Sequence, residues 1–169
     1  MAFRGTGLIL LADTSILIDL EYVGGIAVLP CIAPCEILDV VLAECEHASQ
    51  PELAQNIKQS GITVVETSLV LAGIASASRR GGVSTIDMMT LCHAKERGHT
   101  VLAGDRPLRD RCKEEGVEFR GSIWIVEEAH KNGLVAAVEL LRWLSVWPIV
   151  GRRLPQDEIG RLRQMLSDL

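Results

Sequence analysis

The sequence predicts an α/β fold in which helices cover both faces of a central, mostly parallel sheet. Short apolar runs that are typical of buried strands alternate with segments of helical periodicity over the first 120 residues. The length of 169 residues fits one domain with its own core. The composition, 48% hydrophobic and 23% charged, is that of a globular protein and excludes a disordered chain.

Charge and composition exclude several functional classes. With 17 basic and 22 acidic residues the net charge is −5, which argues against a protein that coats DNA non-specifically. The aromatic content of 4% argues against a surface that stacks the bases of a single strand. Five cysteines, an odd number at low density, favour a reducing compartment, so we expect a cytoplasmic protein. The apolar run at residues 8–12 is too short for a membrane span, so we expect no membrane association.

The first strand and the helix after it are predicted together. Residues 8–12 form a continuous apolar run, as in a strand that is buried on both faces. Asp-Thr-Ser at residues 13–15 follows, and these residue types favour helix N-termini. A helix is therefore expected from this point to the glycine pair that begins at Gly24.

The middle of the chain predicts two further strands and two helices. Residues 30–34, which two prolines bracket, are a candidate strand. Apolar residues then recur at a spacing of four and predict a helix over residues 36–47. The β-branched run at residues 62–65 predicts a strand. Residues 69–77 predict a short helix, which a basic loop at residues 79–82 follows.

The last part of the chain changes from alternating elements to helices alone. The predicted elements are a helix over 84–97, a strand over 100–103, a helix over 105–115, a strand over 117–119 and helices over 123–131, 134–147 and 157–169. We therefore divide the chain into a core, residues 1–120, and a helical C-terminal extension, residues 121–169, packed on that core.

One helix of the extension is strongly apolar. Trp143 and Trp147 lie four residues apart, together with several leucines. This face either packs on its own domain or forms part of a homodimer interface or a groove for a partner helix.

Four acidic residues lie where this fold builds sites. Asp13 and Asp105 follow predicted strands, and open parallel sheets bind ligands at the carboxyl ends of their strands. Asp87 lies in the first turn of a predicted helix, and Glu44 lies beside the apolar stripe of another. Each also has a purely structural explanation: the aspartates as helix caps, with Asp87 in a capping box, and Glu44 as a solvated helix residue.

The sequence around these acids resembles the PIN-domain nucleases. Residues 8–15 (LILLADTS) are similar to the family's opening strand with its Asp and Thr, and residues 41–44 (VLAE) to the helix that carries its active-site Glu. Residues 83–87 (VSTID) match the family's Leu-Ser-x-x-Asp. Residues 101–106 (VLAGDR) resemble the strand before Thr-Asn-Asp, although Ala-Gly replaces Thr-Asn. The acids follow one another at intervals of 31, 43 and 18 residues, in the family's order.

The resemblance implies a three-layer α/β/α sandwich and a metal-dependent endoribonuclease. Four bare carboxylates in one crevice repel one another, and an oxygen-only ligand set suits Mg²⁺ or Mn²⁺. Asp13, Asp87 and Asp105 would be the core metal ligands, and Glu44 would be a ligand or would orient the attacking water. Within the family, the chain resembles the VapC-like toxin ribonucleases, in the subset with a helical C-terminal extension. That resemblance implies a homodimer and an antitoxin partner. An RNA-processing nuclease and a non-catalytic RNA- or protein-binding module are the alternatives.

Other residues are candidates for binding RNA. The hydroxyl groups of Thr14 and Ser15 could hold Asp13 or a phosphate oxygen, or simply cap a helix. Arg79, Arg80 and Arg106 could contact phosphates, or be ordinary surface charges.

Two other interpretations are disfavoured. The cysteine and histidine residues at 31, 35, 45 and 47 have a zinc-like spacing, but burial in the core is the commoner fate of cysteine. A dehalogenase-like phosphatase needs a second Asp two residues after the first, where this chain has Ser15.

Asp110, between two arginines, is expected on a solvated, ion-paired surface.

Overall fold

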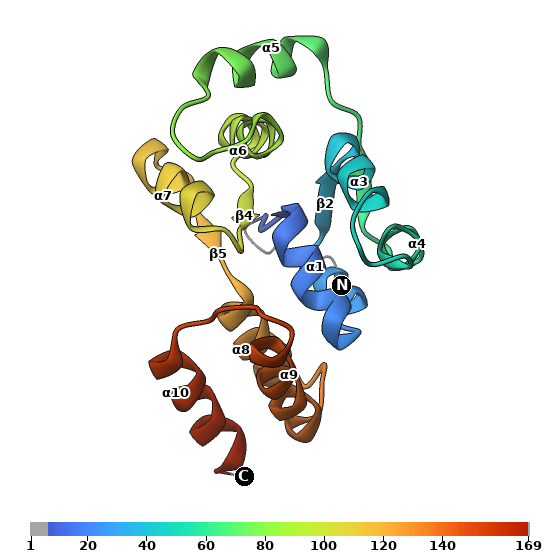
Figure 1. Ribbon diagram of the computed structural model, residues 1–169, viewed down its shortest axis with the longest axis vertical. Coiled ribbons are helices and arrows are strands. Elements are labelled where there is room, and N and C mark those ends of the chain that lie inside the picture. The colour runs from blue at the N-terminus through green and yellow to red at the C-terminus, as the bar shows by residue number, and fades with distance from the viewer. Residues whose placement is uncertain (1–6, 169) are drawn as a thin grey trace.

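The protein is described by a computed structural model for residues 7–168, in which a five-stranded sheet forms the centre (Figure 1). All neighbouring strands are parallel, in the order β3-β2-β1-β4-β5. The strands are β1 (Leu10–Ala12), β2 (Cys35–Leu38), β3 (Thr63–Val65), β4 (Thr100–Leu102) and β5 (Phe119–Arg120). The α/β fold with a parallel sheet is therefore confirmed.

The helices form a layer on each face of the sheet. They are α1 (Thr14–Val23), the 3₁₀ turn η1 (Ile26–Val28), α2 (Leu29–Ile32), α3 (Asp39–Glu46), α4 (Leu53–Gln59), α5 (Leu69–Ser78), α6 (Thr85–Arg97), α7 (Arg106–Glu115), α8 (Ser122–Lys131), α9 (Ala137–Ile149) and α10 (Gln156–Ser167). Helices α1, α3 and α4 contact one another, and α5, α6 and α7 form a second group. The chain winds from β1 toward β3 and then from β4 toward β5, and right-handed crossovers place these two sets of helices on opposite faces.

This topology places a switch point between β1 and β4. The helix after β1 and the helix after β4 leave toward opposite faces, so a crevice opens at the carboxyl ends of these two adjacent strands. Asp13 and Asp105 stand at the N-cap positions of α1 and α7, directly at this crevice.

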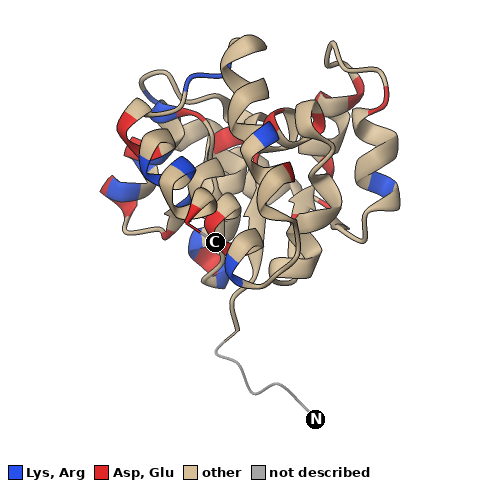
Figure 2. Cartoon of the chain, turned by 90° about the horizontal axis from the view of Figure 1, so that it is seen from below, with Lys and Arg blue, Asp and Glu red and all other residues tan. Residues whose placement is uncertain are grey.

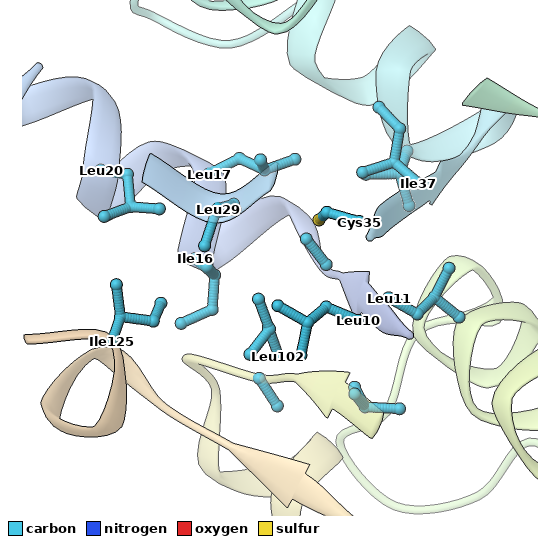
Figure 3. Close-up of a cluster of buried hydrophobic side chains, with 14 of the residues drawn as sticks. Leu10, Leu11, Ile16, Leu17, Leu20, Leu29, Cys35, Ile37, Leu102 and Ile125 are labelled. Atoms are coloured by element: carbon cyan, nitrogen blue, oxygen red, sulfur yellow. The ribbon is translucent and has the colours of Figure 1, made fainter. Parts of the chain in front are cut away.

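An aliphatic core surrounds β1 (Figure 3). Leu10 and Leu11 are fully buried, and the register pairs Leu10 with Cys35 on one side and with Thr100 on the other. Helix α1 covers the strand with Ile16, Leu17 and Leu20, none of which has exposed surface. This burial on both faces explains why the strand is a continuous apolar run.

Two sequence predictions in the segment between α1 and β3 are wrong. Residues 30–34 are not a strand, because Pro30 lies in the first turn of the short helix α2, where a proline is tolerated. The strand is β2, which occupies the residues predicted to begin the next helix, so that helix starts only at Asp39. The prediction failed because Ile37, a residue of β2, lies four positions before Val41 and so fits the helical spacing of the residues that follow. Helix α4 was not predicted at all.

Helix α9 packs tightly against α1, and α10 packs against α8 and α9. Trp147 is completely buried, and its indole N–H donates to the backbone oxygen of Asp19 at 2.8 Å. Trp143 is 2% exposed, and a Cβ at Gly25 would lie only 2.7 Å from its ring, so this position requires glycine. The tryptophan face thus packs within its own chain and does not offer a groove for a partner helix.

No single helix among residues 7–168 is long and apolar enough to cross a membrane. Helix α1 and the segment Ile26–Ile32 reach the required length and composition only as a pair that is bent by 113°. On the side of the molecule shown in Figure 2, acidic and basic residues are interspersed along the helices.

Candidate active site

A pocket of about 330 Å³ at the switch point collects all four predicted acids. Its lining residues are Asp13, Thr14, Ser15, Ile18, Glu44, Ser84, Asp87, Asp105 and Arg152. The acids come from the ends of β1 and β4, from α3 and from the first turn of α6. The chain therefore brings together residues that lie up to 92 positions apart, as the sequence predicts.

Asp13 is the buried centre of the pocket, with 2% of its surface exposed. The backbone N–H of Ile16 donates to its Oδ1 at 2.8 Å, which makes Asp13 the N-cap of α1. The Ser15 hydroxyl lies 3.0 Å from Oδ1 and 2.9 Å from Oδ2 and donates to the same carboxylate. The capping role and the pocket role of Asp13 are thus both real, since one carboxylate can serve both.

The departure from the family pattern at Ala103-Gly104 has a structural reason. The backbone N–H of Gly104 donates to Ser15 Oγ at 3.1 Å and lies 3.4 Å from Asp13 Oδ2. A Cβ at this position would lie 2.6 Å from Ser15 Oγ, so any side chain would displace the serine. In this chain a glycine amide and a serine hydroxyl together hold Asp13 in place.

The other three acids surround Asp13 with fewer restraints. The Ser84 hydroxyl caps α6 by accepting from the backbone N–H of Asp87 at 3.0 Å, and the Asp87 carboxylate faces the pocket. Asp105 is the N-cap residue of α7, and its side chain forms no capping hydrogen bond of normal geometry, although the nearby Leu108 amide partly offsets the rise in its pKa that burial causes. Glu44 lies on the exposed surface of α3 at the pocket wall. Capping therefore does not account for the whole set.

The electrostatics of the pocket favour a bound cation. Burial, and to a smaller extent the charge of Asp87, raises the pKa of Asp13 to about 7. Burial also raises the pKa of Asp87, and the charges of Asp105 and Glu44 add to this effect. The pKa of Asp105 is raised mainly by burial as well. A cluster of oxygen donors that repel one another in this way fits a hard divalent ion such as Mg²⁺ or Mn²⁺.

Without metal, the stability of the protein should fall as the pH rises from about 4 to 7. The folded protein keeps a proton on Asp13 up to about pH 7, whereas the carboxyl group ordinarily loses it near 3.8. The folded state binds more protons in this window, so its free energy of unfolding decreases by up to about 4 kcal/mol and then levels off above pH 7. Urea unfolding in EDTA at several pH values measures this decrease. Asp13→Asn should remove most of the dependence of the unfolding free energy on pH. An equal dependence in the variant would show that Asp13 is not its source.

Of the five residues predicted to bind substrate, only two line the pocket. Thr14 and Ser15 line it. Arg79, Arg80 and Arg106 do not: Arg80 pairs with Glu114 at 3.1 Å, and Arg106 lies 3.6 Å from Asp110, both on the surface. Asp110 is thus exposed and ion-paired, as predicted.

The basic residue that does reach the pocket, Arg152, was missed by the sequence analysis. It follows α9, and its Nε donates to the buried carboxylate of Asp19 on α1. Ser122 donates to the other oxygen of Asp19 at 3.1 Å. No local motif marks Arg152, because a tertiary contact with a helix 133 residues earlier brings it to the site.

The cysteines behave largely as ordinary core residues. Cys35, Cys45 and Cys112 are buried, Cys92 is half-buried, and Cys31 is exposed. Burial raises the pKa of Cys35, Cys45 and Cys112 to about 12, which keeps them as inert thiols.

Comparison with known proteins agrees with this architecture. The sequence model of the PIN domain family (DUF3368) matches residues 9–165, which includes the C-terminal helices. The fold is similar to that of a PilT N-terminus domain protein from the hyperthermophilic archaeon Sulfolobus solfataricus P2, with a TM-score of 0.51 and 13% identity over 73% of this chain and 92% of that chain. A comparison with curated proteins gave no match. Because the family match spans nearly the whole chain, this protein belongs to the PIN-domain family.

Proposed function

We propose that the protein is an Mg²⁺- or Mn²⁺-dependent endoribonuclease that hydrolyses RNA phosphodiester bonds in the acidic pocket. The observation that carries the proposal is the convergence of Asp13, Glu44, Asp87 and Asp105 in one pocket of about 330 Å³. The raised pKa values of the three aspartates support this proposal, because a bound cation would offset the cost of placing their negative charges in the pocket.

In this proposal the residues of the chain divide the work. Asp13, Asp87 and Asp105 would hold the ion. When bound, such an ion lowers the pKa of a coordinated water and polarises a phosphodiester oxygen. Ser15 and the Gly104 amide fix the orientation of the Asp13 carboxylate. Glu44, on the exposed wall, would complete the set of metal ligands or would accept a hydrogen bond from the attacking water and orient it.

A basic groove next to the pocket supplies a path for RNA. The groove has a volume of about 650 Å³ and shares Arg152 with the acidic pocket. Arg109, Arg120 and Arg153 also line it, between the end of β5, α8 and the segment before α10. Arg161 and the acidic residues Asp19, Glu127 and Glu158 line it as well, so arginines outnumber acids by five to three. Arginine contacts to phosphates give affinity without sequence readout, and they would offset the negative net charge of the protein. We propose that the RNA backbone follows this groove into the pocket.

Removing one positive charge from the groove should weaken RNA binding. Arg120→Gln and Arg153→Gln should each raise the Kd for a single-stranded RNA by about 3- to 10-fold. Each should also lower the slope of log Kd against log salt concentration by about one, the value for one phosphate contact. Fluorescence anisotropy at several salt concentrations measures both effects. Arg80→Gln is the matched control, since Arg80 is exposed but pairs with Glu114 away from the groove. Equal effects from all three variants would refute this path.

The proposed activity is tested directly with purified protein and a panel of single-stranded and structured RNAs. Cleavage should require Mg²⁺ or Mn²⁺, stop with EDTA and resume when the metal is restored. RNA that binds in the presence of metal but stays intact throughout the panel would instead support the non-catalytic binding module.

We also propose that the enzyme is the cytoplasmic toxin of a toxin–antitoxin pair. The support is the sequence resemblance to VapC-like toxin nucleases, together with a pocket that a partner's Arg or Lys side chain could fill in place of the metal. Expression should arrest growth, and co-expression of a small protein encoded beside it should restore growth. If the partner places a cation in the pocket, raising the Mg²⁺ concentration should weaken inhibition. Harmless expression of active enzyme would favour a role in RNA processing.

A homodimer is part of the same proposal. Leu69, Val70 and Ile74 on α5 are 91%, 71% and 53% exposed, which is the kind of apolar surface that association buries. Sedimentation equilibrium at high micromolar concentration should give twice the 18.4 kDa of one chain, and Leu69→Ser with Ile74→Ser should restore the single-chain mass. A single-chain mass for the unmodified protein would contradict the dimer.

A further inference from the structure

A second cluster of ligand-type side chains lies apart from the acidic pocket. Glu36 comes from β2, His93 from the last turns of α6, and His99 from the turn between α6 and β4. The strand register explains their proximity, because Glu36 pairs with Leu11 of β1 and the residue after His99 pairs with Leu10. The backbone N–H of His99 donates to the oxygen of Ala94 at 3.0 Å, which holds the turn against the end of α6. The cluster shares no residue with the acidic pocket.

The facing atoms of these side chains are buried and have no hydrogen-bond partner among residues 7–168. They are Oε2 of Glu36, Nε2 of His93 and Nδ1 of His99. Both histidine side chains are only 7% exposed. Burying a polar atom without a partner is costly, so three such atoms close together are a candidate ligand set for a cation.

The spacing of these atoms suits a metal ion better than direct hydrogen bonds. Glu36 Oε2 lies 3.7 Å from His93 Nε2 and 3.5 Å from His99 Nδ1, both beyond the usual hydrogen-bond length. One ligand atom from each of the three residues lies within 4.8 Å of the others. Bonds of about 2.0–2.1 Å to a tetrahedral zinc ion place neighbouring ligand atoms about 3.3 Å apart, so the two distances from Glu36 need only a small contraction.

We propose that Glu36, His93 and His99 bind one divalent transition-metal ion, with Zn²⁺ as the best fit. Two imidazole nitrogens and one carboxylate oxygen form a ligand set that Zn²⁺ accepts and that Mg²⁺ disfavours. The ion connects the sheet to both ends of the α6–β4 turn. Since α6 also carries Asp87 in its first turn, the site fixes the helix that supplies one wall of the acidic pocket.

Zinc binding is tested on the full chain after treatment with EDTA, with ZnCl₂ alone as the probe. Asp13→Asn with Asp105→Asn serves as the background, so that the acidic pocket does not contribute. This protein should bind one Zn²⁺ per chain by calorimetry, and a hundredfold excess of free Zn²⁺ over its Kd should raise Tm by about 5–10 °C. His99→Gln should weaken binding by at least about 100-fold. His47→Gln is the matched control, because His47 is exposed on the surface and lies outside the cluster. This variant should bind Zn²⁺ as tightly as the background protein.

Cobalt spectroscopy on the otherwise unmodified chain covers the case in which a ligand variant fails to fold. Co²⁺ should give visible absorption bands of a four- or five-coordinate site, and one equivalent of Zn²⁺ should remove them. Absence of Zn²⁺ binding, or equal binding by folded His99→Gln and Glu36→Gln, would overturn the site and leave a metal-free pair of histidines sharing one carboxylate. RNA cleavage is not a readout here, so this result is independent of the proposed nuclease activity.

Discussion

Replacing Asp13 with asparagine is expected to lower metal-dependent RNA cleavage by at least about 1,000-fold without unfolding the protein. The asparagine oxygen can still accept from the Ile16 amide, so the cap of α1 survives. In the proposed mechanism, the substitution removes a negative charge that would hold the cation, and with it an interaction on which the transition state would depend. Single-turnover cleavage at saturating Mn²⁺, with circular dichroism to confirm folding, measures the effect.

Asp110→Asn is the matched control for this variant. Asp110 lies one turn beyond Asp105 on α7 but is 64% exposed in its side chain and lies near Arg106. Its replacement should leave the cleavage rate within about twofold. Comparable loss in both variants would show that cleavage depends on overall charge rather than on the pocket, and full activity of Asp13→Asn would refute the mechanism.

Replacing Trp147 with alanine is expected to cost roughly 3–5 kcal/mol of unfolding free energy. The side chain is completely buried between α9 and α1, and its N–H bonds to the Asp19 backbone oxygen. Trp143 packs edge-to-face against it, with ring centroids 6.1 Å apart. Urea unfolding followed by circular dichroism measures the loss, and a single transition would show that the C-terminal helices unfold together with the sheet.

Ile149→Ala on the same helix provides the comparison. Ile149 is 84% exposed, so its replacement should change stability by no more than about 0.5 kcal/mol. A Trp147→Ala variant that is as stable as Ile149→Ala would contradict the close packing of α9 on α1.

Strands with a strong local pattern could be predicted from sequence, and β2 shows why others could not. β1 and β4 are short apolar runs followed by helix-capping residue types, and both lie where the sequence predicts them. β2 spans Cys35–Leu38, where Glu36 interrupts the apolar run and Ile37 fits the periodicity of the next helix, so the local sequence does not indicate a strand. Its position depends on pairing with β1 and β3, which are distant in the chain, so tertiary context overrides the local signal.

In the candidate site, too, residues with a local sequence motif could be predicted, and residues placed only by tertiary contacts could not. The four acids could be found because each has a local motif and because the ends of parallel strands meet at one edge. Arg152 could not, since only the packing of α9 against α1 brings it to Asp19. Arg79 and Arg80 precede the Asp87 helix in sequence, yet neither lines the pocket. The cluster of Glu36, His93 and His99 was likewise invisible, because its members belong to three different elements.

The most direct test of the central claim is the position of Mn²⁺ in crystals soaked with MnCl₂, measured by anomalous scattering. We expect a peak among the carboxylates of Asp13, Asp87 and Asp105, with Glu44 as a direct or water-mediated neighbour, and no such peak in Asp13→Asn crystals. An empty acidic pocket at millimolar Mn²⁺, or an undiminished peak there in Asp13→Asn, would contradict this claim.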